Sequence, residues 1–372
     1  MATPLGVYGM NIAFVTDPLV TTAGATRPPF LLATELQKSG HKLTLISSIV
    51  SDEIQKAAKE KGIEIRCLGS TFSANFSIPF VESWAKSLFK STTSLPTSLT
   101  VDNVLVNTSS SIKVKSHVYY GQGPMTRALD DMHGDMPARY KYMYLLNAPF
   151  LRYLEKNNLY TFARLSDLVV ANSEFCASMY EDFGVKVSAV IPPPLECDLF
   201  TPTTSEPSQD YALTYFGLYN KETKFPVIKQ VADSGVTIKA FGHKAEGIPK
   251  YVLDHPNVHF LGAVSDEELV NLYSNALFVL FTFVHEPFGY IPVESMACGT
   301  PVITYNMQGP SESVIDGTTG WLANSDNELV GLASQIWNEG YSKKMRKDCV
   351  QRASLFDVKK ISAKWLKLFD EL

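Results

Sequence analysis

Residues 11–49 carry the sequence NIAFVTDPLVTTAGATRPPFLLATELQKSGHKLTLISSI, and this stretch decides the fold. Asn11–Thr16 is typical of a buried strand, Pro28–Ser39 of a helix with proline in its first turn, and Lys42–Ile49 of a second strand. A further helix and strand follow at 52–61 and 63–68. Strands that alternate with amphipathic helices in this way predict an α/β domain with a parallel, doubly wound sheet.

The same alternation continues along the chain and is interrupted once. Strands near 103–107, 116–120, 167–172 and 187–191 extend the first sheet, and the proline-rich stretch 191–210 is the best candidate for a linker. The pattern then restarts, with strands expected at 211–216, 236–241, 257–261, 276–283 and 300–305 and helices at 223–234, 266–275, 291–298, 326–338, 342–354 and 357–370. Ser265 and Glu268 form a capping box at the start of one of these helices. The sequence therefore predicts two Rossmann-like domains that face each other across a ligand-binding cleft, 1–195 and 196–356.

Composition excludes several classes of protein. The chain has 372 residues, 45% of them hydrophobic, and a formal net charge of −5, which argues against a nucleic-acid-binding protein. No apolar run is long enough to cross a membrane, and the first 15 residues do not resemble a signal peptide. The five cysteines are scattered, with no spacing typical of a zinc site or a disulfide framework. We therefore expect a cytoplasmic location.

The richest chemistry lies in HEPFGYIPVESMACGTPVI, residues 285–303. Glu286 is predicted in a loop at the carboxyl end of a strand, where Gly289 lets a ligand approach the backbone closely. The start of the next helix offers free amides for a phosphate, and Glu294 lies one turn into it. Carboxylates accept charge-assisted hydrogen bonds from sugar hydroxyls, so the pair suits a sugar nucleotide. The same spacing also fits helix capping by Glu294 and a solvated Glu286.

This segment closely resembles the donor motif of family 4 retaining glycosyltransferases with the GT-B fold. Other stretches resemble the family in order: AGATRPPFLLATELQKSGHKLTLIS, SDLVVANSEF, VHFLGAVSDEELVNLYSNALFVLF and GPSESVIDGTTGWL. The linker IPPPLECDLFTP is similar to that of lipid-linked oligosaccharide mannosyltransferases. The resemblance implies a hexosyltransferase of glycan biosynthesis that retains anomeric configuration and needs no metal. It also implies that the C-terminal helix, 357–372, packs back on the first domain.

The resemblance assigns roles to individual residues. Glu286 would bind hydroxyls of the donor sugar, Glu294 the donor ribose, and the amides near Phe288 and Gly289 would lie over the sugar and diphosphate. We expect the glycine loops of the two domains to contact the nucleotide through Gly24, Gly217 and Gly242. Val264 would contact the base. His117 would lie beside the acceptor and the reacting sugar, although a packed histidine at a strand end explains it equally well.

One position departs from the family. Leu218 stands where the family usually has an arginine that binds the leaving diphosphate. Lys224 is the first candidate for the remaining phosphate cation, and Lys221 is the second because the alignment slips there. Arg27 or another cation of the first domain is a possible substitute for the missing arginine.

The expected partners are a UDP- or GDP-linked sugar, used as co-substrate without a further cofactor, and a glycan, lipid-linked or protein-linked acceptor. The carboxylates in 130–135 lack the spacing of a metal site. The segment 78–90 (IPFVESWAKSLFK) is amphipathic and fits either core packing or weak peripheral contact with a membrane. Two other functions stay open: a sugar-nucleotide epimerase of the same fold, and a non-catalytic binding subunit.

Overall fold

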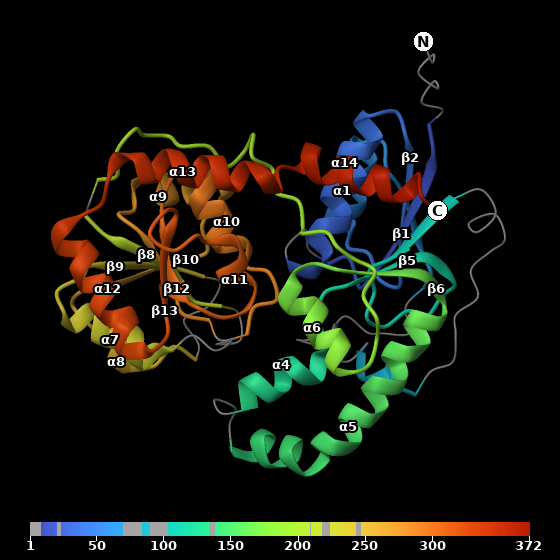
Figure 1. The fold of residues 1–372 in the computed structure, drawn as a ribbon, viewed down its shortest axis with the longest axis horizontal. Coiled ribbons are helices and arrows are strands. Elements are labelled where there is room, and N and C mark those ends of the chain that lie inside the picture. The colour runs from blue at the N-terminus through green and yellow to red at the C-terminus, as the bar shows by residue number, and fades with distance from the viewer. Residues whose placement is uncertain are drawn as a thin grey trace.

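The computed structural model describes residues 9–20, 24–69, 84–89, 103–133, 138–208, 210–217, 224–242, 247–283 and 285–372. These residues form two parallel sheets, each flanked by helices, which lie side by side in Figure 1. No helix in these ranges is long and apolar enough to cross a membrane. The predicted α/β class with two doubly wound sheets is therefore confirmed.

The first sheet has seven parallel strands in the order β3-β2-β1-β4-β5-β6-β7. Its strands are β1 (Asn11–Thr16), β2 (Lys42–Ser47), β3 (Glu64–Cys67), β4 (Asn103–Asn107), β5 (Ser116–Gly121), β6 (Ser166–Ala171) and β7 (Ala189–Val190). The short η1 (Gly24–Thr26) and the helices α1 (Arg27–Lys38), α2 (Asp52–Glu60), α4 (Met125–Met132), α5 (Ala138–Arg164) and α6 (Glu174–Asp182) belong to the same domain. Two prolines in the first turn of α1 fix where that helix begins.

The second sheet has six parallel strands in the order β10-β9-β8-β11-β12-β13. They are β8 (Ala212–Tyr215), β9 (Ile238–Phe241), β10 (Val258–Gly262), β11 (Val279–Phe281), β12 (Val302–Tyr305) and β13 (Gly320–Ala323). The helices around it are α7 (Phe225–Asp233), α8 (Lys250–Leu253), α9 (Asp266–Asn275), α10 (Tyr290–Ala297), α11 (Gln308–Ser313), α12 (Asp326–Glu339) and α13 (Lys343–Ala353). The predicted capping box of α9 is present, with both Ser265 and Glu268 bonded reciprocally.

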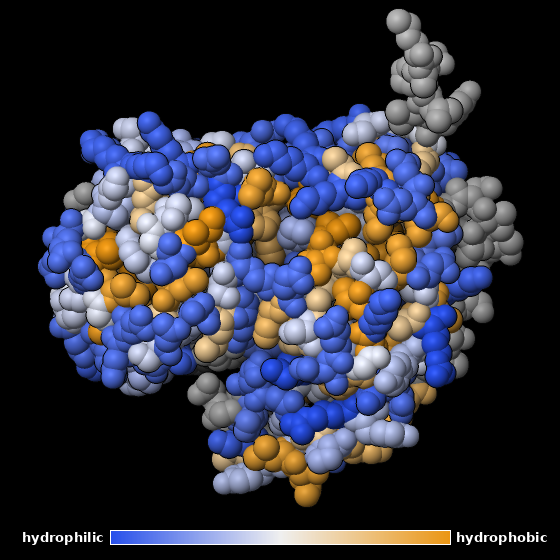
Figure 2. Space-filling view, viewed as in Figure 1, coloured by the Kyte–Doolittle hydropathy of each residue, from blue (hydrophilic) through white to orange (hydrophobic). Residues whose placement is uncertain are grey.

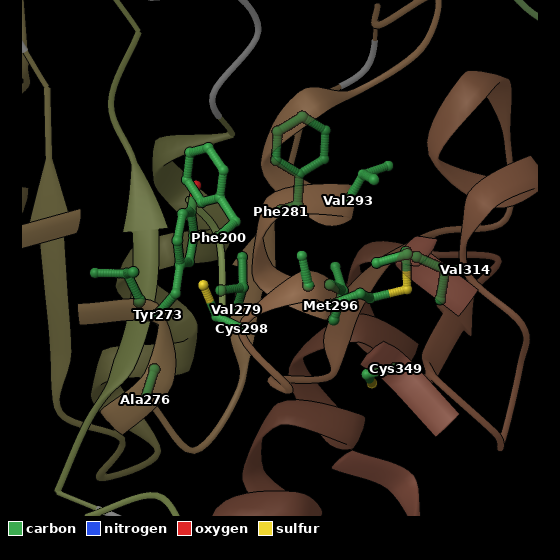
Figure 3. Packing of buried hydrophobic residues seen from close by; sticks show 14 of the residues in the cluster. Phe200, Tyr273, Ala276, Val279, Phe281, Val293, Met296, Cys298, Val314 and Cys349 are labelled. Atoms are coloured by element: carbon green, nitrogen blue, oxygen red, sulfur yellow. The ribbon is translucent and has the colours of Figure 1, made fainter. Parts of the chain in front are cut away.

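A hydrophobic cluster of side chains lies between this sheet and α10. Tyr273, Val279, Val293, Met296 and Cys298 are all buried in it, and Figure 3 shows their side chains close together. Because α10 is buried from Pro292 to Ala297, packing against its neighbours fixes its orientation. The first turns of α10, which carry the predicted donor motif, are held in place by this core.

The chain passes between the two domains twice, at adjacent points. The amide of Leu195 donates to the Phe356 carbonyl, and the amide of Val358 donates to the Leu195 carbonyl, both at 2.8 Å. The short η4 (Ser354–Phe356) leads into the last helix, α14 (Val358–Phe369), which lies across α1 in Figure 1. The ring of Trp365 on α14 is 5.2 Å from that of Tyr120 in the first sheet. The last helix is thus part of the core of the first domain.

The structure adds elements that the sequence pattern does not reveal. The helix α5 has Pro149 in its interior and apolar residues on both its inner and outer faces, so a helical period is hard to recognise. The predicted strand 276–283 is shorter, because pairing with β12 covers only Val279–Phe281. Only 84–89 of the segment 78–90 lies within the described residues. There Trp84 is buried and donates to Glu155 at 3.0 Å, whereas Phe89 is 72% exposed, so only one side of that part of the segment packs as core.

Candidate active site

Loops that follow the carboxyl ends of strands from both sheets meet at one interface. The hydroxyl of Ser173, just after β6, donates to the Pro287 carbonyl, just after β11, at 2.6 Å. Gly123 also lies against Pro287. Since ligands of such sheets bind beyond the carboxyl ends of the strands, this interface is where a substrate site is expected. Figure 2 shows that the molecule is hollowed between the second domain and the helices α4 and α5.

The loop that carries Glu286 has a fixed backbone. The amide of Glu286 donates to the side-chain oxygen of Gln308 at 2.8 Å, and its carbonyl accepts from the Gly309 amide at 3.1 Å. Gly289 closes the loop with a φ of 87°, and a Cβ there would lie 3.0 Å from Pro310. The loop therefore needs glycine at this position. Among the described residues, the half-buried carboxylate of Glu286 has no hydrogen-bond partner and is available to a ligand.

Glu294 has a different environment. It is 5% exposed, and both of its carboxylate oxygens are already bonded. One accepts from the Arg27 guanidinium and the other from the Tyr273 hydroxyl at 2.9 Å. Arg27 comes from α1, so this ion pair joins the two domains.

Arg27 itself lies among aromatic rings. Its guanidinium carbon is 4.3 Å from the centroid of the Tyr290 ring and 5.6 Å from that of Phe200. Burial disfavours the charge on Arg27, but the Glu294 carboxylate outweighs burial, so the pKa of Arg27 is raised above its usual value. The guanidinium is a permanent cation at the boundary of the two domains.

Two more polar contacts connect the domains close to Glu286. His285 Nδ1 lies 2.6 Å from an oxygen of Asp131 on α4. The Glu312 carboxylate on α11 accepts from the amides of Glu174 and Phe175, at 2.9 and 2.6 Å, at the start of α6. These contacts fix how the donor loop faces the first domain.

The residues predicted for the nucleotide lie at the ends of strands, as expected for a cleft. Gly217 follows β8, Gly242 follows β9, and the half-buried Val264 follows β10. A Cβ on Gly242 would lie 2.1 Å from the Phe216 carbonyl oxygen, so the close approach of these two backbones requires glycine. Gly24 lies in η1, three residues before Arg27.

Phe288 is buried against Tyr290 and Phe356, which leaves its backbone, rather than its ring, for a ligand.

The predicted phosphate cation has a partner in this structure. The ammonium of Lys224 lies 2.6 Å from Asp326 on α12 and 4.4 Å from the centroid of the Tyr305 ring. It is not bonded to Glu286 or Glu294. Leu218 and Lys221 fall outside the described residues. The phosphate role of Lys224 stays a prediction.

His117 is not where the sequence analysis expects it. It is the second residue of β5, at the amino end of the strand, and its Nδ1 accepts from the Leu105 amide at 3.0 Å. At about 3.3 Å per residue, it lies roughly 13 Å from the carboxyl end at Gly121. The structure therefore supports the alternative explanation, a packed histidine within the sheet. The residues that follow the carboxyl end of β5 are Gln122 and Gly123.

The carboxylates of α4 are engaged with protein partners. Asp130 binds Arg152 and the Tyr144 hydroxyl, and Asp131 binds His285. Within the described ranges, no group of three or more histidine, cysteine, aspartate or glutamate side chains could hold a metal ion.

Tyr273, Asp131, His285, Gln308 and Glu312 were also absent from the predicted site. Asp131 and His285 are 154 positions apart, and no local pattern in the sequence connects them.

The protein has two parallel sheets, and the loops after the carboxyl ends of their strands meet beside the start of α10, which carries the two glutamates. This arrangement defines the class of protein, the GT-B fold. The chain aligns over 98% of its length with 100% of HepE of Anabaena in complex with UDP, with a TM-score of 0.69 and 17% identity. It aligns over 96% of its length with 99% of WaaG, a glycosyltransferase involved in lipopolysaccharide biosynthesis, with a TM-score of 0.65 and 13% identity. The predicted GT-B fold is confirmed.

Residues 252–355 match the family model of glycosyl transferases group 1, so the recognised resemblance is confirmed for the segment that carries both glutamates. Over 99 residues the chain is 36% identical to alpha-1,3/1,6-mannosyltransferase ALG2 of Dictyostelium discoideum, which is 26% of this chain and 24% of the relative. Over 77 residues it is 35% identical to glycogen synthase of Mycobacterium tuberculosis, which is 21% of this chain and 18% of the relative. The chain thus matches about a quarter or less of these curated relatives.

Proposed function

We propose that the protein transfers a sugar from a nucleotide-diphosphate sugar to an acceptor hydroxyl, with retention of anomeric configuration and without a metal ion. The observation that carries this proposal is the pair Glu286 and Glu294 at the start of α10, in a segment that matches the group 1 family. Retention and metal independence rest on the family resemblance alone. HepE has been solved with UDP-glucose and the ALG2 relatives are mannosyltransferases, so UDP- and GDP-linked hexoses are the donors to test first.

In this proposal the free carboxylate of Glu286 accepts hydrogen bonds from hydroxyls of the donor sugar. The backbone of Phe288 and Gly289 and the first amides of α10 face the diphosphate, whose negative charge suits a helix N-terminus. As the bond to the leaving group breaks, negative charge grows on the diphosphate, and donors already fixed in position stabilise it most.

Glu294 can bind the ribose only if its bonds to Arg27 and Tyr273 rearrange. We propose that the donor displaces Arg27 from Glu294, and that the freed guanidinium then contacts the diphosphate. Arg27 would thereby replace the arginine that the family usually has at the position of Leu218. Movement of the two domains about the paired crossings near Leu195 and Val358 would accompany this exchange.

The acceptor in this proposal is a glycan, lipid-linked or protein-linked, and the protein acts in the cytoplasm in glycan biosynthesis. This location is consistent with the five free cysteines.

The test is calorimetry with UDP and GDP, followed by transfer assays with UDP-glucose and GDP-mannose on the full chain. Glu286→Gln should lower kcat/KM by roughly a hundredfold, since a contact to the reacting sugar is lost. Glu267→Gln, at an exposed position on α9, is the matched control. Activity should persist in excess EDTA.

Three outcomes would contradict the proposal. Interconversion of the donor sugar without an acceptor would identify an epimerase. Nucleotide binding without turnover on any acceptor would indicate a binding subunit. Loss of turnover in EDTA that magnesium or manganese restores would contradict metal independence.

A further inference from the structure

The helix α5 buries one face and exposes the other. Its inner face packs on the first domain through residues that recur at helical spacing, namely Tyr144, Ala148, Glu155, Leu159 and Phe162. Its first half extends away from the sheet, at the lower edge of the molecule in Figure 1. The helix is therefore firmly anchored but has an unpartnered outer surface.

That outer surface is apolar and aromatic. Tyr142, Leu146, Phe150 and Tyr153 follow one stripe at spacings of four, four and three residues, and are 69%, 84%, 55% and 62% exposed. Met143 and Leu145 flank the stripe and are also exposed. Figure 2 shows hydrophobic side chains gathered at this lower tip. Six large apolar side chains thus lie on one exposed helix face, and a protein normally covers such a surface with a partner or a membrane.

The charge of the helix indicates which partner. The sequence of α5 contains Arg139, Lys141, Arg152, Lys156 and Arg164 but only one acidic residue, Glu155, in a chain whose net charge is −5. Glu155 is buried, and its carboxylate accepts bonds from Trp84, from the amides of Met125 and Thr126, and from the Thr126 hydroxyl. Every charged side chain described on the exposed part of α5 is thus basic. Arg152 is paired with Asp130 on α4, so Lys141 and Lys156 are the described cations beside the stripe that have no acidic partner.

We propose that α5 lies in the headgroup region of an anionic membrane, with Tyr142, Leu146, Phe150 and Tyr153 inserted at the boundary of the acyl chains. Tyrosine and phenylalanine beside lysine and arginine are the composition of helices that lie in a membrane interface. A second copy of the chain suits this surface poorly, because two basic helices would face each other. The proposal does not depend on the glycosyltransferase activity, and it concerns a different segment from 78–90.

The experiment is flotation of the full chain with vesicles of phosphatidylcholine alone or with about one-third phosphatidylserine. The wild-type chain should float with the anionic vesicles and much less with the neutral ones. Leu146→Glu combined with Phe150→Glu should lower the bound fraction by at least roughly tenfold. The matched control is Tyr251→Glu combined with Leu355→Glu, at positions that are 46% and 47% exposed elsewhere on the molecule. Equal melting temperatures by circular dichroism show that all variants fold.

A second pair of variants tests the electrostatic part. Lys141→Glu with Lys156→Glu should weaken binding severalfold, and so should about 0.5 M salt, whereas Lys364→Glu with Lys367→Glu on α14 should have little effect.

Several results would overturn the proposal. These are no binding by the wild-type chain, equal binding by the Leu146/Phe150 variant, and binding that neither salt nor lipid charge alters. A wild-type dimer in sedimentation velocity that the Leu146/Phe150 variant dissociates would instead assign the surface to a second copy of the chain.

Discussion

Arg27 and Glu294 form a buried ion pair between the two domains. Their side chains are 16% and 7% exposed, and they come from different domains. Such a pair contributes little to the free energy of unfolding, because both charges lose hydration. Removing one partner is costly, however, because it leaves the other charge buried without a counter-charge. Replacing Glu294 alone therefore tests stability and ligand binding at once, and a clean experiment must change Arg27 as well.

We expect Arg27→Met to lower the free energy of unfolding by about 3 kcal/mol, since it leaves the Glu294 carboxylate buried without its cation. The measurement is urea denaturation. Adding Glu294→Gln to Arg27→Met should recover much of the loss, because no charge is then stranded. If the single and double variants are equally unstable, the ion pair is not the cause.

A second prediction about a single residue concerns Lys224. If its ammonium leaves Asp326 to bind the diphosphate, Lys224→Met should lower kcat more than it raises KM, by roughly a hundredfold. Asp326→Asn, which removes the same ion pair but keeps the cation, should retain kcat. Equal and small effects of the two variants would mean that Lys224 acts only in the contact between α7 and α12.

At the scale of elements, α11 of one domain caps α6 of the other through Glu312. The bound amides at a helix N-terminus favour the carboxylate form, but burial is the larger effect and raises the pKa of Glu312 above its usual value of 4.5. The folded protein thus binds this proton at higher pH than the unfolded chain does. The contribution of Glu312 to stability should therefore grow as pH falls from neutral toward 4.5.

The difference in unfolding free energy between the wild-type chain and Glu312→Gln isolates this group. We expect the difference to shift in favour of the wild type between neutral pH and about pH 5, because glutamine does not titrate. Glu328→Gln, at an exposed helix start elsewhere, is the control. A difference that stays constant, or moves the other way, would show that the amides of α6 dominate over burial.

At the scale of the whole molecule, the last helix connects the two domains mechanically. Ile361, Trp365 and Phe369 are buried in the core of the first domain, although the preceding helices belong to the second. Any rotation of one domain relative to the other must therefore change the backbone at both chain crossings near Leu195 together.

Trp365→Ala should destabilise the first domain by about 3–5 kcal/mol, since the indole is fully buried against Tyr120 and leaves a large cavity. Thermal unfolding followed by circular dichroism measures the effect, and Lys364→Ala at the exposed neighbouring position is the control. A loss confined to the second domain, or no loss, would contradict the placement of α14 in the first core.

The sequence by itself determined the fold class and the donor motif, because both are local. Periods of apolar residues specify strands and helices, and the capping box at Ser265 and the glycine before α10 act over a few residues. Glu286 and Glu294 are recognisable for the same reason, as they belong to one continuous segment.

Only the tertiary structure decided which distant residues meet. It showed that Glu294 is paired with Arg27, 267 positions away, and that Lys224 is paired with Asp326. It removed His117 from the cleft, because the direction of β5 determines which end of the strand faces a ligand. It also separated the two faces of α5, which the sequence does not distinguish because both are apolar. Burial and long-range contacts depend on how the sheets and helices assemble, and no local pattern records them.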